Sequence, residues 1–157
     1  MKNLMLVLKK FYYSNITKKY ISWLKNKDII KFTRIDPNTN ISKIKKYIKH
    51  HQNNSKEKLY RIIYQRKHVG NIRIYFPQKK TATIAILIGS IENHSKGIGT
   101  KSIYLALKIL RKLKIKEVLA YVHEKNIASI KIFKKNNFKI IENNNGIIFR
   151  FLFNKKK

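Results

Sequence analysis

The spacing of apolar residues along the chain switches repeatedly between the two-residue period of a strand and the 3.6-residue period of a helix. The run from Lys2 to Lys9 is rich in leucine and predicts a first strand. Apolar residues then recur at fourfold spacing and predict a helix: Ile16, Tyr20 and Leu24, with Trp23 beside them. Ser14 or Asn15 can cap this helix.

The rest of the N-terminal half predicts a loop, a second helix and three strands. The loop runs from Asp28 to Asn40 and contains Pro37. The inward positions of the second helix are Ile41, Ile44, Ile48 and His51. The strands run from Leu59 to Gln65, from Val69 to Phe76 and from Thr81 to Gly89. Pro77 closes the second strand, and the third is apolar on both faces, as a central strand is.

The C-terminal half predicts a helix from Ile98 to Leu113, a strand from Glu117 to His123 and a helix begun by Asn126. Inward positions of the first of these helices are Ile103, Ala106 or Leu107, Leu110 and Leu113. A hairpin of Asn137 to Ile141 and Gly146 to Phe153 follows, and the tail from Asn154 to Lys157 is expected to fray. The order β-α-α-β-β-β-α-β-α-β-β contains no repeat or linker, and 157 residues predict one domain over positions 1–157.

Two of the five glycines, Gly97 and Gly99, stand one residue apart where a predicted strand gives way to a helix. Glycine lets the backbone approach a ligand closely. The first turn of the following helix presents unpaired N–H groups and the positive end of the helix dipole. Strand, glycine turn and helix together are typical of a site for an anion such as a phosphate.

Spacing separates three kinds of phosphate-binding loop. A P-loop needs four residues between its glycines, and a dinucleotide-binding fingerprint needs a third glycine where Ser102 stands. The segment His94-x-x-Gly97-x-Gly99 instead resembles the acetyl-coenzyme A loop of the GNAT N-acetyltransferases, whose pattern is Gln or Arg, two residues, Gly, any residue, Gly or Ala. A glycine turn that only starts a helix is the alternative.

A second segment resembles the same family. Its members carry, after the next strand, a helix that opens with Asn-x-x-Ser and runs on to an aromatic residue and a Gly-Phe or similar pair. Here Asn126 and Ser129 open the helix, Phe133 is the aromatic residue, and Asn137-Phe138 is the final pair.

The resemblance covers at least residues 59 to 153 and implies a GNAT fold of the α/β (α+β) class. Such a fold has a mixed central sheet of about seven strands, splayed between strands 4 and 5 and flanked by four helices. The resemblance implies acetyl-CoA as cosubstrate and no metal. The residues that would hold the cofactor are Leu87, Ile88, Gly89, His94, Lys96, Gly97, Ile98, Gly99, Thr100, Lys101, Asn126 and Phe133. Asn126 can instead, or also, be the N-cap of its helix.

Acetyl transfer to an amine needs a base for the amine and a proton for the leaving thiolate. The candidate bases are Glu92, just before the loop, and His123 and Glu124, at the end of the fifth strand. We favour His123, with a plain surface histidine and a water-relayed mechanism as alternatives. Many family members supply the second proton from a tyrosine four residues after the helix serine. That place is Phe133 here, so water or Ser129 is left.

The acceptor side of the family is its N-terminal third. The segment from Tyr20 to Arg34 resembles the pattern Tyr-x-x-Trp-Leu-Asn-Asp-x-x-Val of bacterial acetyltransferases encoded with surface-polysaccharide and flagellin-glycan genes. Those enzymes act on the amino group of nucleotide-linked deoxy amino sugars, and the resemblance implies the same acceptor here. The substrate-side candidates are Trp23, Phe32, Arg34 and Arg73. Trp23 as plain core of the first helix is the alternative.

The formal net charge of +30 arises from 37 Lys and Arg against 7 Asp and Glu. An AT-rich genome favours lysine, asparagine and isoleucine, so compositional drift is one explanation, and attraction to anionic ligands is the other. No specific nucleic-acid partner is expected, because the arginines are scattered and no aromatic-basic repeat is present. A basic nucleic-acid-binding module, a ribosomal-type protein N-terminal acetyltransferase and a non-catalytic acetyl-CoA-binding protein are the alternative functions.

The chain has no cysteine, which excludes disulfides and thiolate catalysis. It has no apolar run of the length that spans a membrane and no cleavable signal pattern, so a cytoplasmic protein without a membrane span is expected. The sequence leaves a homodimer open.

Overall fold

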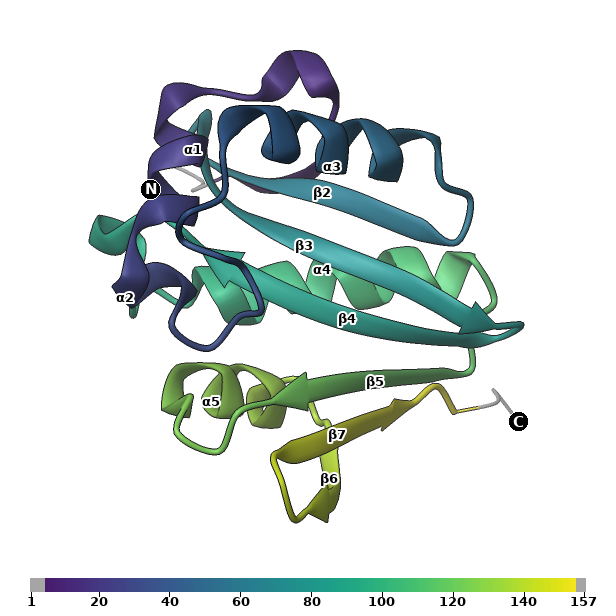
Figure 1. The fold of residues 1–157 in the computed structure, drawn as a ribbon. Helices are drawn as coiled ribbons and strands as arrows, with labels where there is room; N and C mark the ends of the chain where they lie inside the picture. The colour runs from purple at the N-terminus through teal and green to yellow at the C-terminus, as the bar shows by residue number, and fades with distance from the viewer. Residues whose placement is uncertain (1–4, 155–157) are drawn as a thin grey trace.

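The computed structural model describes residues 5–154 and contains one mixed sheet of seven strands (Figure 1). The strands are β1 (Leu6–Lys10), β2 (Glu57–Tyr64), β3 (Lys67–Gln78), β4 (Thr81–Ile88), β5 (Glu117–Val122), β6 (Lys139–Asn143) and β7 (Ile147–Leu152). Their order across the sheet is β1-β2-β3-β4-β5-β7-β6. Neighbours pair antiparallel except β4 and β5, which are parallel. The fold class and the predicted succession of strands are confirmed.

Helices cover both faces of the sheet. They are α1 (Lys18–Lys25), α2 (Lys27–Ile30), α3 (Ile41–Asn53), α4 (Ile98–Lys112) and α5 (Ile127–Lys135), with 3-10 turns η1 (Tyr13–Asn15) and η2 (Ile91–Asn93). In Figure 1, α3 lies in front of the sheet and α4 behind it. No helix in the part of the chain that the structure describes is long and apolar enough to cross a membrane.

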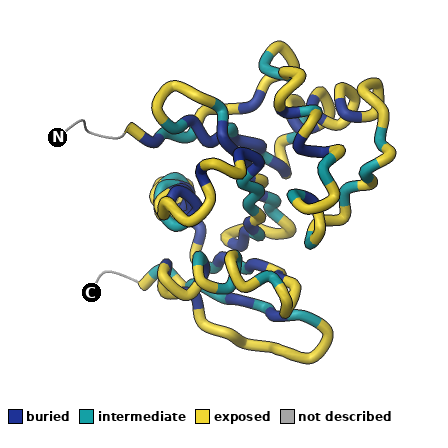
Figure 2. The backbone as a smooth tube through the Cα atoms, turned by 90° about the vertical axis from the view of Figure 1, so that its left-hand side faces the viewer, coloured by how far each residue is buried: buried dark blue, intermediate teal, exposed yellow. Residues whose placement is uncertain are grey.

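Two apolar cores, one on each face, hold these layers together. The larger lies between the sheet and the helices α4 and α5, and its fully buried members include Ile72, Ile103 and Leu110. The smaller lies beneath α1 and α3 and includes Trp23 and Ile48. Figure 2 shows the buried positions along the strands and the inner sides of the helices, with the turns between them exposed. The sheet thus separates a side built on α4 and α5 from a side built on α1, α2 and α3.

The structure corrects the predicted start of the first helix. Thr17, rather than Ser14 or Asn15, is the N-cap of α1, because its Oγ1 accepts a hydrogen bond from the amide of Tyr20 at 3.1 Å. The two predicted caps lie in η1 instead. The first residues of the predicted strand Lys2 to Lys9, and the last three of the predicted tail, lie outside the described residues.

A fifth helix stands where the sequence predicts only loop. The one-turn α2 forms because the side chain of Asn26 accepts from the amides of Asp28 and Ile29, while Ile30 is buried. Local capping therefore outweighs the polar composition of this stretch.

Two apolar residues predicted to face inward and one proline also differ from expectation. Ile41, at the start of α3, is 45% exposed, and the buried residues of this helix are Ile44, Ile48 and His51. Leu113 is 47% exposed, because α4 ends at Lys112 and Lys114 takes a positive φ of 57°, so Ile115 is the next residue to enter the core. β3 continues past Pro77 to Gln78, because the pairing with β4 shifts register between Tyr75 and Gln78. Proline is tolerated at such an irregularity.

Candidate active site

β4 and β5 pair over a short stretch and then separate. Residues 81–83 of β4 pair with residues 117–119 of β5. β4 runs on to Ile88 beside β3, and β5 runs on to Val122 beside β7. The edge of β4 from Ile84 to Ile88 therefore has no β5 partner, and Figure 1 shows the two strands diverging toward their C-terminal ends. The splay predicted between strands 4 and 5 is confirmed.

The glycine loop lies at the end of this splay, and its two glycines are needed for different reasons. Gly97 is the N-cap of α4 and has φ +73°, a left-handed conformation that costs other residues about 1–2 kcal/mol. A Cβ on Gly97 would meet nothing within 4 Å. A Cβ on Gly99 would lie 2.4 Å from Cδ1 of Ile132 on α5. Gly97 permits the turn, whereas Gly99 permits close packing of α4 on α5.

The first turn of α4 leaves backbone donors open. The first intrahelical bond joins the amide of Lys101 to the carbonyl of Gly97 at 3.0 Å. The amides of Ile98, Gly99 and Thr100 precede it and have no helix carbonyl to meet, and Gly97 has no side chain that could accept from them. Lys101 adds a positive charge beside these donors. The residues present therefore fit a pyrophosphate group.

His94 ties the start of the loop to the end of β4. Its Nε2 lies 3.0 Å from the carbonyl oxygen of Ile88. A carbonyl only accepts, so Nε2 carries a proton and donates it. The carbonyl keeps a second lone pair for a ligand. Two residues that the sequence places in the cofactor site are thus in direct contact.

The N-terminus of α5 is capped as the sequence predicts. Asn126 Oδ1 accepts a hydrogen bond from the amide of Ser129 at 3.1 Å. This cap uses only the oxygen of the side-chain amide, so the NH₂ group is available to a ligand.

Asn136 connects the two helices of the cofactor side, and the sequence interpretation missed it. Its buried Nδ2 donates to the carbonyl of Thr100 on α4 at 3.0 Å and to the carbonyl of Ile132 on α5 at 2.9 Å. The only sequence signal was its place directly before the final Asn-Phe pair of the second motif. Asn136 holds the first turn of α4 against α5, and thereby positions the open amides.

Phe133, at the place of the family's tyrosine, belongs to the core. It is 2% exposed and stacks on Phe149 with 5.7 Å between ring centroids. Its edge contact with Phe138 has a centroid distance of 5.1 Å. This ring supports α5 from below and supplies no proton.

His123 lies at the end of β5 and meets the acceptor side of the molecule. Its ring is 5.0 Å from that of Phe32, which follows α2. His123 Nδ1 accepts a hydrogen bond from the amide of Lys125 at 3.1 Å. The neutral ring then carries its proton on Nε2, so the exposed nitrogen is a donor. The base role predicted for His123 requires a lone pair that this arrangement commits to Lys125.

The two candidate carboxylates differ in their surroundings. Glu92 accepts from Ser90 Oγ at 2.6 Å and from Lys19 Nζ at 3.3 Å. The Ser90 hydrogen bond, with smaller contributions from the backbone and Lys19, lowers the pKa of Glu92 to about 2, so its carboxylate is a weak base at neutral pH. Glu124 is exposed in the turn after β5.

A hollow of about 250 Å³ lies beside the end of β4. Its lining brings together three residues that the sequence assigns to the site with others from α1, α2 and η2: Ser22, Trp23, Asn26, Ile29, Gly89, Ser90, Ile91 and Glu92.

Trp23 forms the wall behind this strand end and is only 4% exposed. A Cβ on Gly89 would lie 2.0–2.5 Å from atoms of the Trp23 ring, so the indole packs directly on the Gly89 backbone. The structure therefore places Trp23 in the core of α1, where it positions the end of β4.

The sequence interpretation also missed His68, which lies beneath Trp23. The His68 ring packs against Phe11, Tyr20 and Trp23, and Nε2 lies 3.0 Å from the carbonyl of Gly70. Burial lowers the pKa of His68. This neutral imidazole supports the Trp23 ring, which in turn packs on the end of β4.

The two candidate arginines stand apart. Arg34 is exposed in the segment between α2 and α3. Arg73, on β3, donates to Glu57 Oε1 at 2.5 Å, and the other oxygen of Glu57 pairs with Nδ1 of buried His51. Arg73 keeps 44% of its side chain exposed. Of the four substrate-side candidates, Phe32 lies beside His123 at the end of β5. Arg73 lies on β3, with its side chain partly exposed.

Comparison with known proteins agrees with this geometry. The family model of the acetyltransferase (GNAT) domain matches residues 6–139. A sequence search of curated proteins gave no significant match.

Three solved structures share the fold. A domain from Methanocaldococcus jannaschii has a TM-score of 0.83 at 22% identity, over 96% of this chain and 100% of that one. Spermidine N-acetyltransferase from Vibrio cholerae, in complex with CoA and spermine, has a TM-score of 0.79 at 15% identity, over 92% of each chain. The N-acetyltransferase PseH from Campylobacter jejuni has a TM-score of 0.68 at 17% identity, over 94% of this chain and 97% of that one.

The family match spans most of the chain, and the splayed sheet, the open amides of the glycine loop and the capped α5 are the features that the family motifs predict. The chain belongs to the GNAT acetyltransferase family and is an N-acetyltransferase that uses acetyl-CoA.

Proposed function

We propose that this enzyme acetylates the primary amine of a nucleotide-linked deoxy amino sugar, for the biosynthesis of a bacterial surface polysaccharide. The observation that carries the proposal is the formal net charge of the protein, +30, compared with the charge of the possible acceptor molecules. A nucleotide diphosphate turns the acceptor into an anion, which a basic surface attracts.

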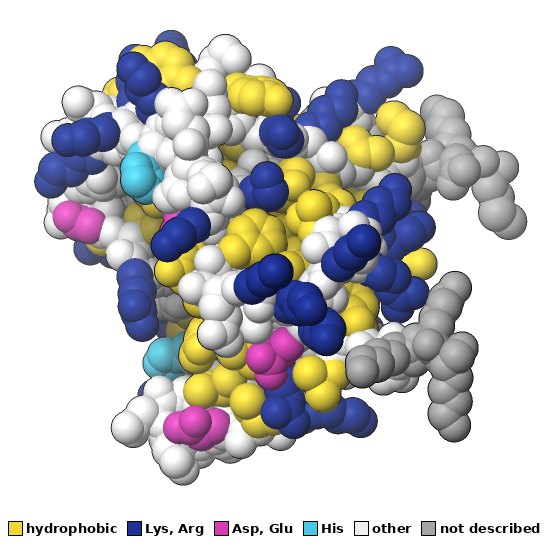
Figure 3. Space-filling model, turned by 90° about the vertical axis from the view of Figure 1, so that its right-hand side faces the viewer, with side chains coloured by type: hydrophobic (Ala, Val, Ile, Leu, Met, Phe, Trp, Pro, Cys, Tyr) yellow, Lys and Arg dark blue, Asp and Glu magenta, His cyan; other side chains and the backbone are white. Residues whose placement is uncertain are grey.

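Polycationic acceptors fit this surface poorly. Figure 3 shows Lys and Arg side chains spread over one face of the molecule with few carboxylates between them. Two of the seven carboxylates, Glu57 and Glu92, are already paired with cations. The Vibrio cholerae enzyme acts on spermidine, whose several positive charges would be repelled here. A peptide N-terminus would also find few acidic partners.

The entry to the splay offers groups suited to a neutral sugar and a charged tail. Phe32 and His123 lie side by side, one from each side of the splay, and present an aromatic face and an N–H donor. Lys31 and Arg34 flank Phe32 in sequence and supply positive charge. We assign the acceptor amine to this end of the groove.

The cofactor would lie along the open edge of β4. Backbone groups of Leu87 and Ile88 and the carbonyl of Gly89 would meet the pantetheine arm, because the Gly89 amide donates to the carbonyl of Val69. The amides of residues 96–100 and the charge of Lys101 would hold the pyrophosphate. Bound acetyl-CoA supplies the acetyl group as a thioester. A backbone N–H at the strand end would stabilise negative charge on the carbonyl oxygen, a contribution of about 3 kcal/mol.

Few side chains are available to accept and donate the two protons that the reaction moves. The amine nitrogen bonds to the carbonyl carbon while the carbon–sulfur bond breaks, so one proton leaves the amine and one reaches the sulfur. Glu124, or a water molecule, is left as acceptor of the first proton, because Glu92 is too weak a base and His123 presents an N–H. Water or Ser129 delivers the second, because Phe133 has no hydroxyl.

The experiment is the release of free coenzyme A thiol from acetyl-CoA with three groups of acceptors: nucleotide-linked amino sugars, polyamines with aminoglycosides, and ribosomal-protein N-terminal peptides. Turnover restricted to the first group is the expected result. Faster turnover of a polyamine or a peptide would overturn the proposal. Binding of acetyl-CoA without turnover of any acceptor would favour a non-catalytic protein.

A further inference from the structure

The half of the sheet formed by β5, β7 and β6 has no helix on the side where α1, α2 and α3 lie. The apolar core on that side takes Leu59 from β2 and Leu87 from β4, and no residue of β5, β6 or β7 among those that the structure describes. The opposite face of the same strands is buried in the larger core through Val118, Ala120 and Phe149. Figure 1 shows β5 and β7 with no helix in front of them. One face of this half of the sheet is therefore open to solvent.

The open face is apolar along both β5 and β7. Side chains alternate between the two faces of a strand, so Leu119 and Tyr121 lie on the face opposite to Val118. Tyr121 pairs in register with Ile148, and Leu152 lies four residues further along β7 on the same face. Tyr121 is 65% exposed and Leu152 is 54% exposed. An exposed apolar patch with charged residues beside it is typical of an interaction surface. We call this surface the β5–β7 patch; its residues are Glu117, Leu119, Tyr121, Ile148, Arg150 and Leu152.

The charges on this face balance one another. Glu117 and Arg150 belong to the patch itself. Lys139 and Glu142 of β6 extend it, because they pair in register with Arg150 and Ile148 of β7. Two carboxylates thus stand beside two cations, in a chain whose formal net charge is +30. None of the three ion pairs among the described residues includes Glu117 or Arg150, so both are available to charged groups of a partner.

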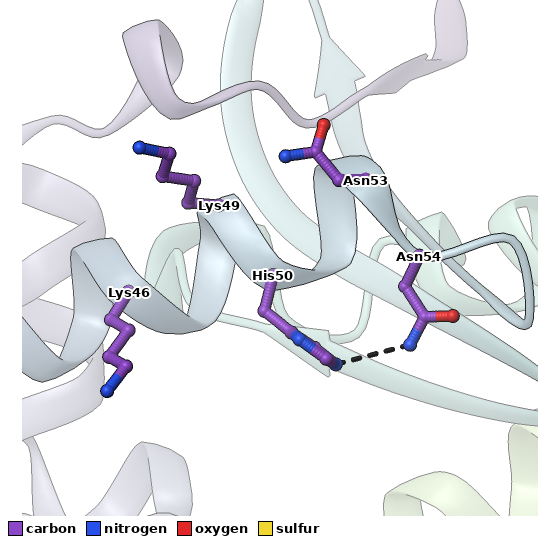
Figure 4. A pocket seen from close by; sticks show the side chains of 5 residues that line it. All are labelled: Lys46, Lys49, His50, Asn53 and Asn54. Carbon is purple, nitrogen blue, oxygen red and sulfur yellow. Dashed lines mark hydrogen bonds between the residues drawn. The ribbon is translucent and has the colours of Figure 1, made fainter.

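The helical surfaces are basic by comparison. Figure 4 shows the surface of α3, where Lys46 and Lys49 project to opposite sides of the helix. On the same surface, Asn54 Nδ2 is hydrogen-bonded to His50 Nε2 at 3.2 Å. Neither α3 nor α4 contains an acidic residue, so two copies of the chain repel each other at such surfaces. The β5–β7 patch combines apolar area with balanced charge, and it is therefore suited to contact with a second copy.

We propose that the β5–β7 patch is the contact surface between two copies of this chain, which pack sheet face to sheet face around a two-fold axis. Such an axis uses the same patch twice, so a contact from Glu117 of one copy to Arg150 of the other is repeated in the opposite direction. The two residues lie on neighbouring strands in successive rows of the face, because Leu119 is the register partner of Arg150. One axis can therefore form both ion pairs, and it buries Tyr121 and Leu152 of both copies between the sheets.

The patch lies next to the acceptor end of the candidate active site. Tyr121 stands two residues before His123, whose ring contacts that of Phe32. Each of the two active sites would therefore lie beside the interface. The proposed contact does not depend on which amine the enzyme acetylates.

The test measures the molar mass of the full chain in solution by sedimentation equilibrium, at protein concentrations from about 1 to about 100 μM and at physiological salt. A monomer–dimer equilibrium is the expected result. Arg150→Glu lowers the net charge of the chain, and with it the general repulsion between copies. It should nevertheless raise the dimer dissociation constant at least about tenfold, because it places a carboxylate opposite Glu117. Lys108→Glu makes the same change in net charge on α4 and should not weaken the dimer.

A mixing experiment tests the ion pair itself. Glu117→Arg should also weaken the dimer at least about tenfold, because it places two cations opposite each other. An equimolar mixture of the Arg150→Glu and Glu117→Arg chains should form dimers again, because both contacts between unlike chains then join opposite charges. Such a rescue also shows that neither variant is unfolded.

A matched pair of tyrosine variants tests the apolar part of the patch. Tyr121→Ser should raise the dissociation constant at least about tenfold, whereas Tyr104→Ser, at a site on α4 that is 54% exposed, should not. A chain that stays monomeric over the whole concentration range would overturn the proposal and leave the patch to a partner of another kind. A dimer that neither Arg150→Glu nor Tyr121→Ser weakens, or a mixture that fails to restore it, would place the interface elsewhere.

Discussion

The two sides of the β4–β5 splay are built on different principles. On the cofactor side, the backbone presents the binding groups: the amides ahead of Lys101, the left-handed turn at Gly97 and the open edge of β4. On the proposed acceptor side, side chains would do so: Phe32 lies against His123, and the cations Lys31 and Arg34 are close to Phe32 in the chain. Backbone sites need particular small residues at fixed spacing, whereas side-chain sites can be rebuilt from many residue types.

The contact between the two sides is the most sensitive point of this arrangement. Gly89→Ala places a methyl group against the rigid Trp23 ring, so we expect the free energy of unfolding to fall by about 3 kcal/mol. Acetyl-CoA binding should weaken as well, because the β4 end must shift. Chemical denaturation and calorimetric titration measure the two effects.

A double-mutant cycle is the control for Gly89→Ala. Trp23→Leu removes the ring that the methyl group meets, so the double variant should be less destabilised than the sum of the single variants. If the changes in the free energy of unfolding were strictly additive, the methyl group at position 89 and the Trp23 ring would not be in steric conflict.

The two loop glycines should separate in the same experiments. Gly97→Ala should lower the free energy of unfolding by about 1–2 kcal/mol, because alanine is strained in the left-handed conformation of Gly97. It should also weaken acetyl-CoA binding, because this turn orients the open amides. Gly99→Ala meets the flexible tip of Ile132, which can move aside, so its effect should be smaller. Equal effects of the two substitutions would contradict the distinct roles assigned to them.

A pair of His123 variants tests the acceptor side. If the exposed Nε2–H is a hydrogen-bond donor, His123→Gln keeps a donor at a similar place, and its kcat/KM should fall less than about threefold, whereas His123→Ala should lose about tenfold. A general base contributes about 10²-fold or more, and glutamine cannot replace it. A loss of that size in both variants, with the acidic limb of the pH profile abolished, would restore the base role.

The smallest predicted effect is a pH dependence of stability from the histidines under the acceptor side. Burial lowers the pKa values of His68 and His51, so the unfolded chain binds protons more readily than the native one. Stability should therefore fall as the pH decreases through about 6.5, the ordinary histidine pKa, and rise to a plateau above it. Urea unfolding at a series of pH values measures this slope.

His68→Gln should flatten that slope, because it removes the imidazole whose pKa burial lowers. An unchanged slope in His68→Gln would show that this histidine titrates alike in the folded and unfolded chain.

The difference between backbone sites and side-chain sites explains which parts of the fold and of the candidate site could be predicted from the sequence. The strand succession, the splay, the cap at Asn126 and the glycine turn follow from periodicity and from residues with special backbone roles. α2 was missed because a single asparagine cap nucleates it within a polar stretch. Asn136, His68 and the His51–Glu57–Arg73 pairing were missed because they act through contacts between segments far apart in the chain. Periodicity carries no information on such contacts.

The most direct test of the central claim is the ratio of kcat/KM for a nucleotide-linked amino sugar to that for spermidine, measured at low and at high salt. An enzyme with a basic acceptor side should prefer the nucleotide-linked sugar at least about tenfold at low salt, and the preference should shrink as salt screens the charges. A ratio near one that does not change with salt, or a preference for spermidine, would contradict the account.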